Sequence, residues 1–216
     1  MADSAVKKSS LVPNPSYAQA ATHAQLERAA AHLRAHGFTV VITPDRAGAL
    51  QTVLSLIPEH SEVLLSTSQT LAQIGLTKEV EESGKFESVR KRMGALDRKT
   101  QQREMRLLGQ APDYDVGSVH AVTEDGELLI ASATGSQIGP YAFGAGKVIW
   151  VVGAQKVVPT LQDGLKRLRE YSLPLEDARA LQAYGMNSGL NKTLIISREV
   201  NPSRATVILV EEILGF

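Results

Sequence analysis

Apolar residues along this chain alternate between short β-branched runs and segments with helical spacing. The runs at residues 38–43 (FTVVIT), 62–65 (EVLL) and 148–152 (VIWVV) predict strands, because β-branched and aromatic residues fit a pleated surface. Residues 46–57 and 71–82 carry apolar positions at the spacing of amphipathic helices. This order predicts an α/β fold with a mostly parallel central sheet flanked by helices, in which the three strands are neighbours.

The two ends of the chain predict further elements. Residues 1–15 predict a flexible or strapped-down N-terminal arm, and Ser16 is expected to cap a helix that runs to about His36. Two closing strands are expected near the C-terminus, on either side of the turn at Asn201-Pro202. The length of 216 residues suits one core. We therefore expect a single α/β domain over residues 16–216.

Residues 116–153 (VGSVHAVTEDGELLIASATGSQIGPYAFGAGKVIWVVG) hold a predicted hairpin and a glycine-rich passage. The dipeptide Asp125-Gly126 between two apolar runs favours a type I′ turn, which needs positive φ at both central residues. The passage that follows carries four glycines: Gly135, Gly139, Gly144 and Gly146. They either let the backbone approach an anion with free N–H groups or only route a crossover over the sheet, and the pattern leaves both readings open.

A hydroxyl-rich turn follows the predicted strand at residues 62–65. Helix N-termini present unpaired N–H groups, and ligands of open parallel sheets lie beyond the carboxyl ends of the strands. A carboxylate or phosphate would fit there; the alternative is that Thr67 or Ser68 only caps the helix. The residues expected to bind a small anionic metabolite are Ser66, Thr67, Ser68, Gln69 and Thr70, facing Gly135, Ser136, Gln137, Gly144, Gly146 and Lys147, with Lys156 as a further source of charge.

Composition excludes several classes of chemistry. Lys plus Arg and Asp plus Glu number 23 each, so no global field favours nucleic acid or a membrane surface. The absence of cysteine excludes disulfides, thiolate or iron–sulfur ligation and a cysteine nucleophile. The histidines are not expected to form a metal site, so we expect no metal and no cofactor in this chain. Without a visible secretory segment or a membrane-length apolar run, we expect a cytoplasmic location and no membrane insertion.

Residues 90–106 form a locally basic segment, with seven Lys and Arg residues against Asp97 and Glu104. A charge run in a helical segment is typical of a solvated face, and an anion-steering rim is the alternative. No aromatic residues are interleaved as stacking platforms, so nucleic acid is not an expected partner.

Two blocks, GSVHAVTEDGELLIASATGSQIGPYAFGAGKVIWVVGAQKVV and the terminal VILVEEILGF, resemble the lactate-utilisation (LUD) domain family. This is the family of the C subunit of the bacterial lactate-utilisation system, and the resemblance covers roughly residues 38–216. It implies the fold shared by ribose-5-phosphate isomerase, glucosamine-6-phosphate isomerase and CoA transferases. It also implies a connection to the oxidation of L-lactate to pyruvate alongside iron–sulfur partner subunits. The cysteine-rich insert of many members is replaced here by residues 184–191 (YGMNSGLN), so any cluster function of that insert cannot apply.

Comparison with the wider fold group restrains the catalytic hypotheses. The acid–base aspartate of the isomerases falls at Val119, and a valine cannot move a proton. The CoA-transferase glutamate nucleophile is similar in outline to Glu124, the one candidate catalytic residue, although a hairpin turn accounts for it equally well. Three function classes stay open: an anion-binding subunit associated with lactate oxidation, a self-sufficient isomerase or acyl-CoA transferase-like enzyme, and a regulatory or scaffold protein. A homo-oligomer stays open as well.

Overall fold

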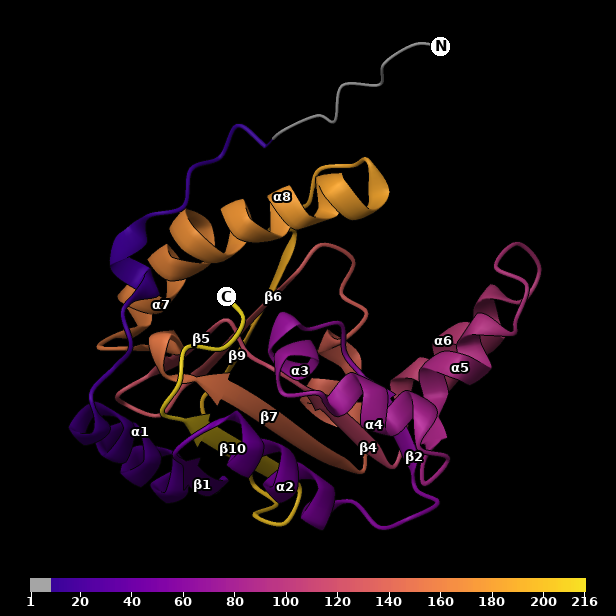
Figure 1. Ribbon diagram of the computed structural model, residues 1–216, viewed down its shortest axis with the longest axis horizontal. Helices are drawn as coiled ribbons and strands as arrows, with labels where there is room; N and C mark the ends of the chain where they lie inside the picture. Colours follow the sequence, from indigo (N-terminus) through magenta and orange to yellow (C-terminus); the bar gives the residue numbers. More distant parts are fainter. Residues whose placement is uncertain (1–8) are drawn as a thin grey trace.

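Two β-sheets organise the chain, and helices cover the outer face of each (Figure 1). The structure is a computed structural model that describes residues 9–216, so the first eight residues of the expected N-terminal arm lie outside the described residues. Residues that follow lie along the C-terminal helices: the Ser9 hydroxyl donates to Asp177 at 2.5 Å, and the Asn14 amide donates to the Glu170 carbonyl at 2.8 Å.

The large sheet has six parallel strands in the order β1-β10-β7-β4-β2-β3. This confirms the α/β fold with a mostly parallel central sheet flanked by helices. The three strands predicted as neighbours share the sheet, but β10 separates β1 from β7 and β4 separates β7 from β2. The strands are β1 (Thr39–Thr43), β2 (Glu62–Leu65), β3 (Glu87–Ser88), β4 (Tyr114–Gly117), β7 (Lys147–Gly153) and β10 (Ala205–Val210).

The small sheet has four strands in the order β8-β5-β6-β9. The predicted hairpin is present as the antiparallel pair β5–β6, with Val122 opposite Leu128. Its turn is not type I′, because Gly126 has a φ of 85° whereas Asp125 has no positive φ. The two closing strands separate, since β9 pairs with β6 while β10 enters the large sheet. The strands are β5 (Ala121–Thr123), β6 (Leu128–Ser132), β8 (Val157–Val158) and β9 (Lys192–Ile196).

Helix α1 (His23–Ala35) begins later than predicted. Thr22 caps it in a reciprocal capping box with Gln25, whereas Ser16 lies in the short 3₁₀ turn η1 (Pro15–Ala18). The helix expected over residues 71–82 is broken at Gly75, whose φ is 82°. It becomes α3 (Gln69–Gln73) and α4 (Leu76–Glu82).

The remaining helices cover the two sheets or project from them. Helices α2 (Arg46–Leu56), α3 and α4 cover one face of the large sheet, and α5 (Val89–Gly94) and α6 (Gln102–Gln110) project to the right in Figure 1. Helices α7 (Leu161–Arg167) and α8 (Leu173–Tyr184), joined by the π-helical turn η4 (Leu168–Ser172), lie over the small sheet (Figure 1). Short turns η2 (Pro140–Gly144) and η3 (Ala154–Lys156) flank β7. Within residues 9–216 no helix is long and apolar enough to cross a membrane.

The main core lies between the two sheets. Trp150 of β7 is fully buried there, with edge-on contacts to Tyr141 at 5.5 Å and Phe38 at 6.4 Å between ring centroids. Leu128 and Ile130 of the small sheet belong to the same apolar cluster as Val152 of the large sheet. The two sheets therefore share one core rather than forming separate domains.

Candidate functional site

The carboxyl ends of β2, β4 and β7 bring a buried lysine against two hydroxyl groups. Thr70 belongs to α3, Ser118 follows β4, and Lys156 ends η3 just after β7. The Lys156 Nζ lies 2.9 Å from the Thr70 Oγ1 and 2.9 Å from the Ser118 Oγ. We call these three residues the lysine–hydroxyl cluster.

Hydrogen bonding in the lysine–hydroxyl cluster has a fixed direction. The Ser118 hydroxyl donates to the Val151 carbonyl at 2.6 Å, and the Thr70 hydroxyl donates to the Leu214 carbonyl at 3.2 Å. Both hydroxyls therefore accept from Lys156. The remaining tetrahedral position of the Lys156 nitrogen, a third N–H or a lone pair, has no partner within residues 9–216.

Electrostatics at Lys156 disfavour its charged form. Its side chain is only 2% exposed, and it forms no ion pair in the part of the chain that the structure describes. Burial, and secondarily the nearby Arg167 guanidinium, holds the pKa of Lys156 well below its ordinary value. An anion placed near this amine would reverse that balance and favour its protonation.

A second polar cluster lies on the other side of Gly117. The Ser66 hydroxyl donates to Asp115 Oδ1 at 3.2 Å, and the Tyr141 hydroxyl lies directly over the Gly117 Cα, where a Cβ would approach within 1.6 Å. Burial raises the pKa of Asp115 well above its usual range, with the Ser66 hydrogen bond opposing the shift. Burial, and then the charge of Asp115, raises the pKa of Tyr141. Burial therefore disfavours the charged form of both groups.

Arg90 of the basic segment lies at the rim of the turn formed by residues 66–70. Its Nη1 lies 3.4 Å from the Thr67 Oγ1 and 3.5 Å from the Leu65 carbonyl, and its Nε lies 3.9 Å from Glu81. Ser68 caps α3 by accepting from the Leu71 amide at 3.5 Å, which is the capping role left open by the sequence. The turn thus combines the exposed Thr67, the partly buried Ser66 and Ser68, a partly exposed arginine and the buried Lys156 behind Thr70.

The C-terminal segment packs against the lysine–hydroxyl cluster. Gln155 accepts from the Leu214 amide at 3.2 Å and donates to the Leu214 carbonyl at 3.0 Å. Gly215 donates to Gln73 at 2.8 Å, and a Cβ on Gly215 would lie 2.3 Å from the Thr70 Oγ1. These contacts, which sequence reasoning missed, place the last residues beside Thr70.

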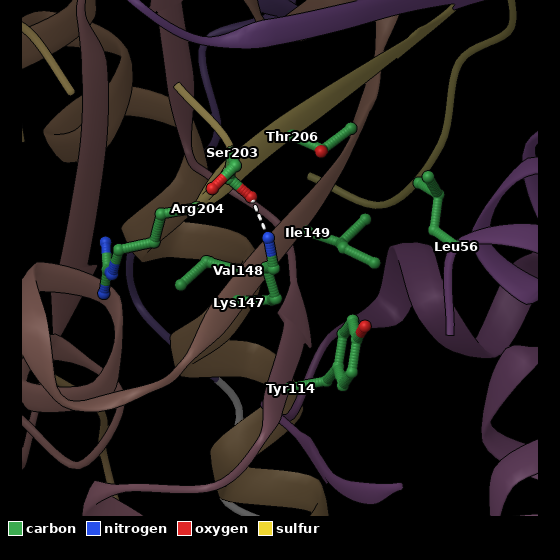
Figure 2. Close-up of a pocket in the computed structure, with 8 residues that line it drawn as sticks. All are labelled: Leu56, Tyr114, Lys147, Val148, Ile149, Ser203, Arg204 and Thr206. Carbon is green, nitrogen blue, oxygen red and sulfur yellow. Dashed lines mark hydrogen bonds between the residues drawn. The ribbon is translucent and has the colours of Figure 1, made fainter. Parts of the chain in front are cut away.

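Lys147, at the end of the glycine passage, does not face this turn as expected. Lys147 begins β7, whereas the turn lies at the carboxyl end of the sheet, because parallel strands all point the same way. Figure 2 shows Lys147 donating to the Ser203 carbonyl beside a cavity of about 160 Å³ near Leu56 and Tyr114. Tyr141, which belongs to the same glycine passage, does contact Ser66 of the turn.

The glycines and polar residues of that passage have structural contacts instead. A Cβ on Gly144 would lie 1.8 Å from the Gln110 carbonyl oxygen, and one on Gly146 would lie 3.0 Å from that of Asp113. Gln137 accepts from Ser132 at 2.9 Å, and its amide donates to the Ala131 carbonyl. Gly135, with a φ of 92°, and Ser136 continue this same turn after β6. Close backbone packing accounts for Gly144 and Gly146, and a hydrogen-bonded turn accounts for Gly135, Ser136 and Gln137.

Glu124 is hydrogen-bonded to residues of α1 and has no contact with the lysine–hydroxyl cluster. Its carboxylate accepts from Arg28 at 2.7 Å and from Gln25 at 3.1 Å, and the Arg28 hydrogen bond holds the pKa of Glu124 below its usual value. His32 and His36 stand four residues apart, a spacing found in metal sites. Both instead bond hairpin carbonyls, those of Glu124 and Gly126. Within residues 9–216 no group of three or more acidic or histidine side chains is placed to hold a metal ion.

The partly buried His120 and the fully buried Arg167 lie beside the lysine–hydroxyl cluster. His120 accepts from the Ala131 amide at 3.1 Å, and burial lowers the pKa of His120 to about 3. Arg167 donates to the Gln155 carbonyl at 3.2 Å, to the Ser172 hydroxyl at 3.0 Å and to the His120 carbonyl. Its Nη2 is buried without a hydrogen-bond partner among the described residues.

Comparison with known families agrees with this architecture. The LUD domain family model matches residues 26–210, which is most of the chain. The chain belongs to the LUD-domain family. It is thus a lactate-utilisation-type protein in the general sense of that family.

Among solved structures, this LUD-domain chain is similar to the crystal structure of a DUF162 family protein from Deinococcus radiodurans at 1.70 Å resolution. The two share 11% identity over 87% of this chain and 96% of the other, with a TM-score of 0.55. At that identity the likeness shows the fold alone. No curated protein matches the chain.

Proposed function

We propose that this chain binds a small anion, a carboxylate or a phosphate, at the turn formed by residues 66–70. In this proposal it serves as a non-redox subunit associated with the oxidation of L-lactate to pyruvate by partner iron–sulfur proteins. The observation that carries the anion site is Lys156. It is a buried amine without an acidic partner among the described residues, and both of its hydrogen bonds go to hydroxyls at this end of the sheet.

Surface groups complete the proposed site. Arg90 supplies a full charge beside the Thr67 hydroxyl, and charge-assisted hydrogen bonds contribute about 1.5–3 kcal/mol each. Lys156 lies behind this surface and supplies charge once protonated. Because the pKa of free Lys156 is lowered, anion binding would take up a proton. The affinity should therefore rise as the pH falls.

Calorimetric titration tests the site with L-lactate, pyruvate and inorganic phosphate at two pH values. Arg90→Met and the double variant Thr67→Ala/Ser68→Ala should each weaken binding about tenfold or more, since each removes donors from the turn. Lys156→Met should weaken binding and remove its pH dependence. Lys147→Met is the control, because Lys147 lies at the opposite end of β7. Unchanged affinity in Arg90→Met and in the double variant would place the anion elsewhere.

The redox part of the proposal has its own test. The chain has no cysteine to hold a cluster, so L-lactate should reduce a dye acceptor only when an iron–sulfur protein is added. Lactate-dependent dye reduction by the chain alone would contradict the non-redox role and would favour a self-sufficient enzyme.

A scaffold role is the second candidate. Thr70 is fully buried, the C-terminal segment packs beside it, and Lys156 is covered by the rest of the protein. A scaffold should show no heat of binding with any of the three anions at either pH.

A further inference from the structure

Helix α6 presents an exposed face that the body of the molecule does not cover. Met105, Leu108 and Gly109 are turned toward the molecule, and Gly109 packs against the Met93 side chain of α5. Arg103, Arg106 and Leu107 are exposed, and Leu107 is 56% exposed. Positions three and four apart on a helix lie on one side, so Arg103 lies beside both Arg106 and Leu107, and Glu104 also lies beside Leu107.

The turn η2 places an aromatic side chain next to this helix. Gly144 and Gly139 fit against Gln110, the last residue of α6, since a Cβ on either would lie within 1.9 Å of a Gln110 oxygen. Phe143 precedes Gly144 and is 88% exposed, and Leu107 lies one turn before Gln110. We call Arg103, Arg106, Leu107 and Phe143 the α6–η2 face.

The base of the α6–η2 face is rigid. Arg204 donates to the carbonyls of Pro140 at 2.9 Å, Tyr141 at 3.1 Å and Ala145 at 3.2 Å, and the Tyr141 ring is buried beside Trp150. Phe143 is thus exposed on a turn that hydrogen bonds hold in place. A backbone that is already ordered loses little entropy when a partner covers its side chains.

The arm formed by α5, α6 and the loop between them carries mostly positive charge. Lys91, Arg98, Lys99, Arg103 and Arg106 form no ion pair within the described residues, and only Asp97 and Glu104 oppose them on this arm. Protein interfaces bury aromatic and aliphatic anchors and are enriched in arginine, whereas single-stranded nucleic acid needs successive stacking platforms. A second copy of the same face would repel this one, because an isologous contact brings like charges together.

We propose that the α6–η2 face docks an acidic protein surface, with Phe143 and Leu107 as apolar anchors and Arg103 and Arg106 as the charged rim. The partner presents carboxylates around an apolar groove. This docking is independent of the anion site, because none of the four residues belongs to the turn formed by residues 66–70.

The defined probe is a fluorescent acidic amphipathic peptide built from Glu-Leu-Ala-Glu repeats, with its binding followed by polarisation. The full chain should bind it, and Phe143→Ser/Leu107→Ser and Arg103→Glu/Arg106→Glu should each weaken binding about tenfold or more. Added salt should weaken binding to the wild type and have little effect on the charge-reversed variant. Val200→Ser and Arg198→Glu are matched controls, because both residues are exposed and lie outside the α6–η2 face.

Four outcomes would overturn the proposal. The first is that the peptide does not bind, and the second is that the face variants and the controls bind it equally well. The third is that a DNA duplex or phosphatidylserine vesicles bind this face more tightly than the peptide does. The fourth is a dimer seen by sedimentation that Phe143→Ser/Leu107→Ser abolishes, because a second copy would then cover the face. The face variants should bind the small anion like the wild type, which separates this test from that of the anion site.

Discussion

Burial disfavours the charged form of three ionisable side chains near the site. Burial lowers the pKa of Lys156 and of His120, and it raises the pKa of Asp115. The sequence indicated the hydroxyl turn, because hydroxyl residues follow a strand. It could not indicate the partners of Lys156, which stand 86 and 38 positions away and meet it only through the sheet.

The stability of the fold should depend on pH through His120. The pKa of this residue is about 3 in the folded chain and about 6.5 when unfolded, so the unfolded chain takes up its proton first on acidification. This contribution to stability is complete above the unfolded value and is lost as the pH falls toward the folded value. The slope is at most about 1.4 kcal/mol per pH unit.

Urea unfolding of the wild type and of His120→Gln, measured from neutral pH to about pH 4, tests this. The Gln side chain can still accept from the Ala131 amide, so the variant should remain folded at neutral pH. The free energy of unfolding of the wild type should fall more steeply with acidification than that of the variant. Parallel curves would show that His120 titrates normally in the folded chain.

At the scale of elements, local chemistry could be predicted better than long-range pairing. The strand at residues 62–65 is where the pattern predicts it, and Ser68 takes the capping role that its residue type favours. The first strand of the predicted hairpin instead divides between two sheets, because β4 ends at Gly117 in the large sheet and β5 begins at Ala121 in the small sheet. Alternating apolar residues fit either sheet, so the pattern alone carries no signal for that division.

Gly117 illustrates a contact between elements that the sequence hides. Gly117→Ala would place a methyl group 1.6 Å from the Tyr141 hydroxyl and 3.1 Å from the Ser66 Cβ, and both neighbours are packed. We expect a loss of about 1–3 kcal/mol in the free energy of unfolding, typical of overpacking. Gly94→Ala is the control, because a Cβ there meets nothing within 4 Å, and alanine in a helix should be neutral or stabilising.

A double-mutant cycle with Tyr141→Phe identifies the cause. Removing the hydroxyl oxygen leaves the Tyr141 ring carbon 2.8 Å from the added methyl group, so the overlap is reduced but not removed. Gly117→Ala should therefore cost less in the Tyr141→Phe background than in the wild type. Equal costs in both backgrounds would assign the loss to the backbone of β4 rather than to Tyr141.

At the scale of the whole molecule, the α/β class could be predicted from the order of apolar runs, and the second sheet could not. Strands β5, β6 and β9 have burial patterns that give no direct sign of a separate sheet, since β5 and β6 are buried on both faces. The family match over residues 26–210 includes both sheets, which agrees with a single folding unit. That unity rests on the core between the sheets.

Because the two sheets share this core, the described chain should unfold in one cooperative transition. Trp150 is the single tryptophan of the sequence and lies between the sheets, so its fluorescence reports the core while far-ultraviolet circular dichroism reports all elements. The two unfolding curves should coincide.

Leu128→Ala in the small sheet should lower the free energy of unfolding obtained from both signals by the same amount, about 2–5 kcal/mol, because Leu128 is fully buried in the shared core. Ile195→Ala is the control, since Ile195 is 40% exposed and should cost far less. Two separated transitions, or a Leu128→Ala effect confined to one signal, would show that the sheets unfold independently.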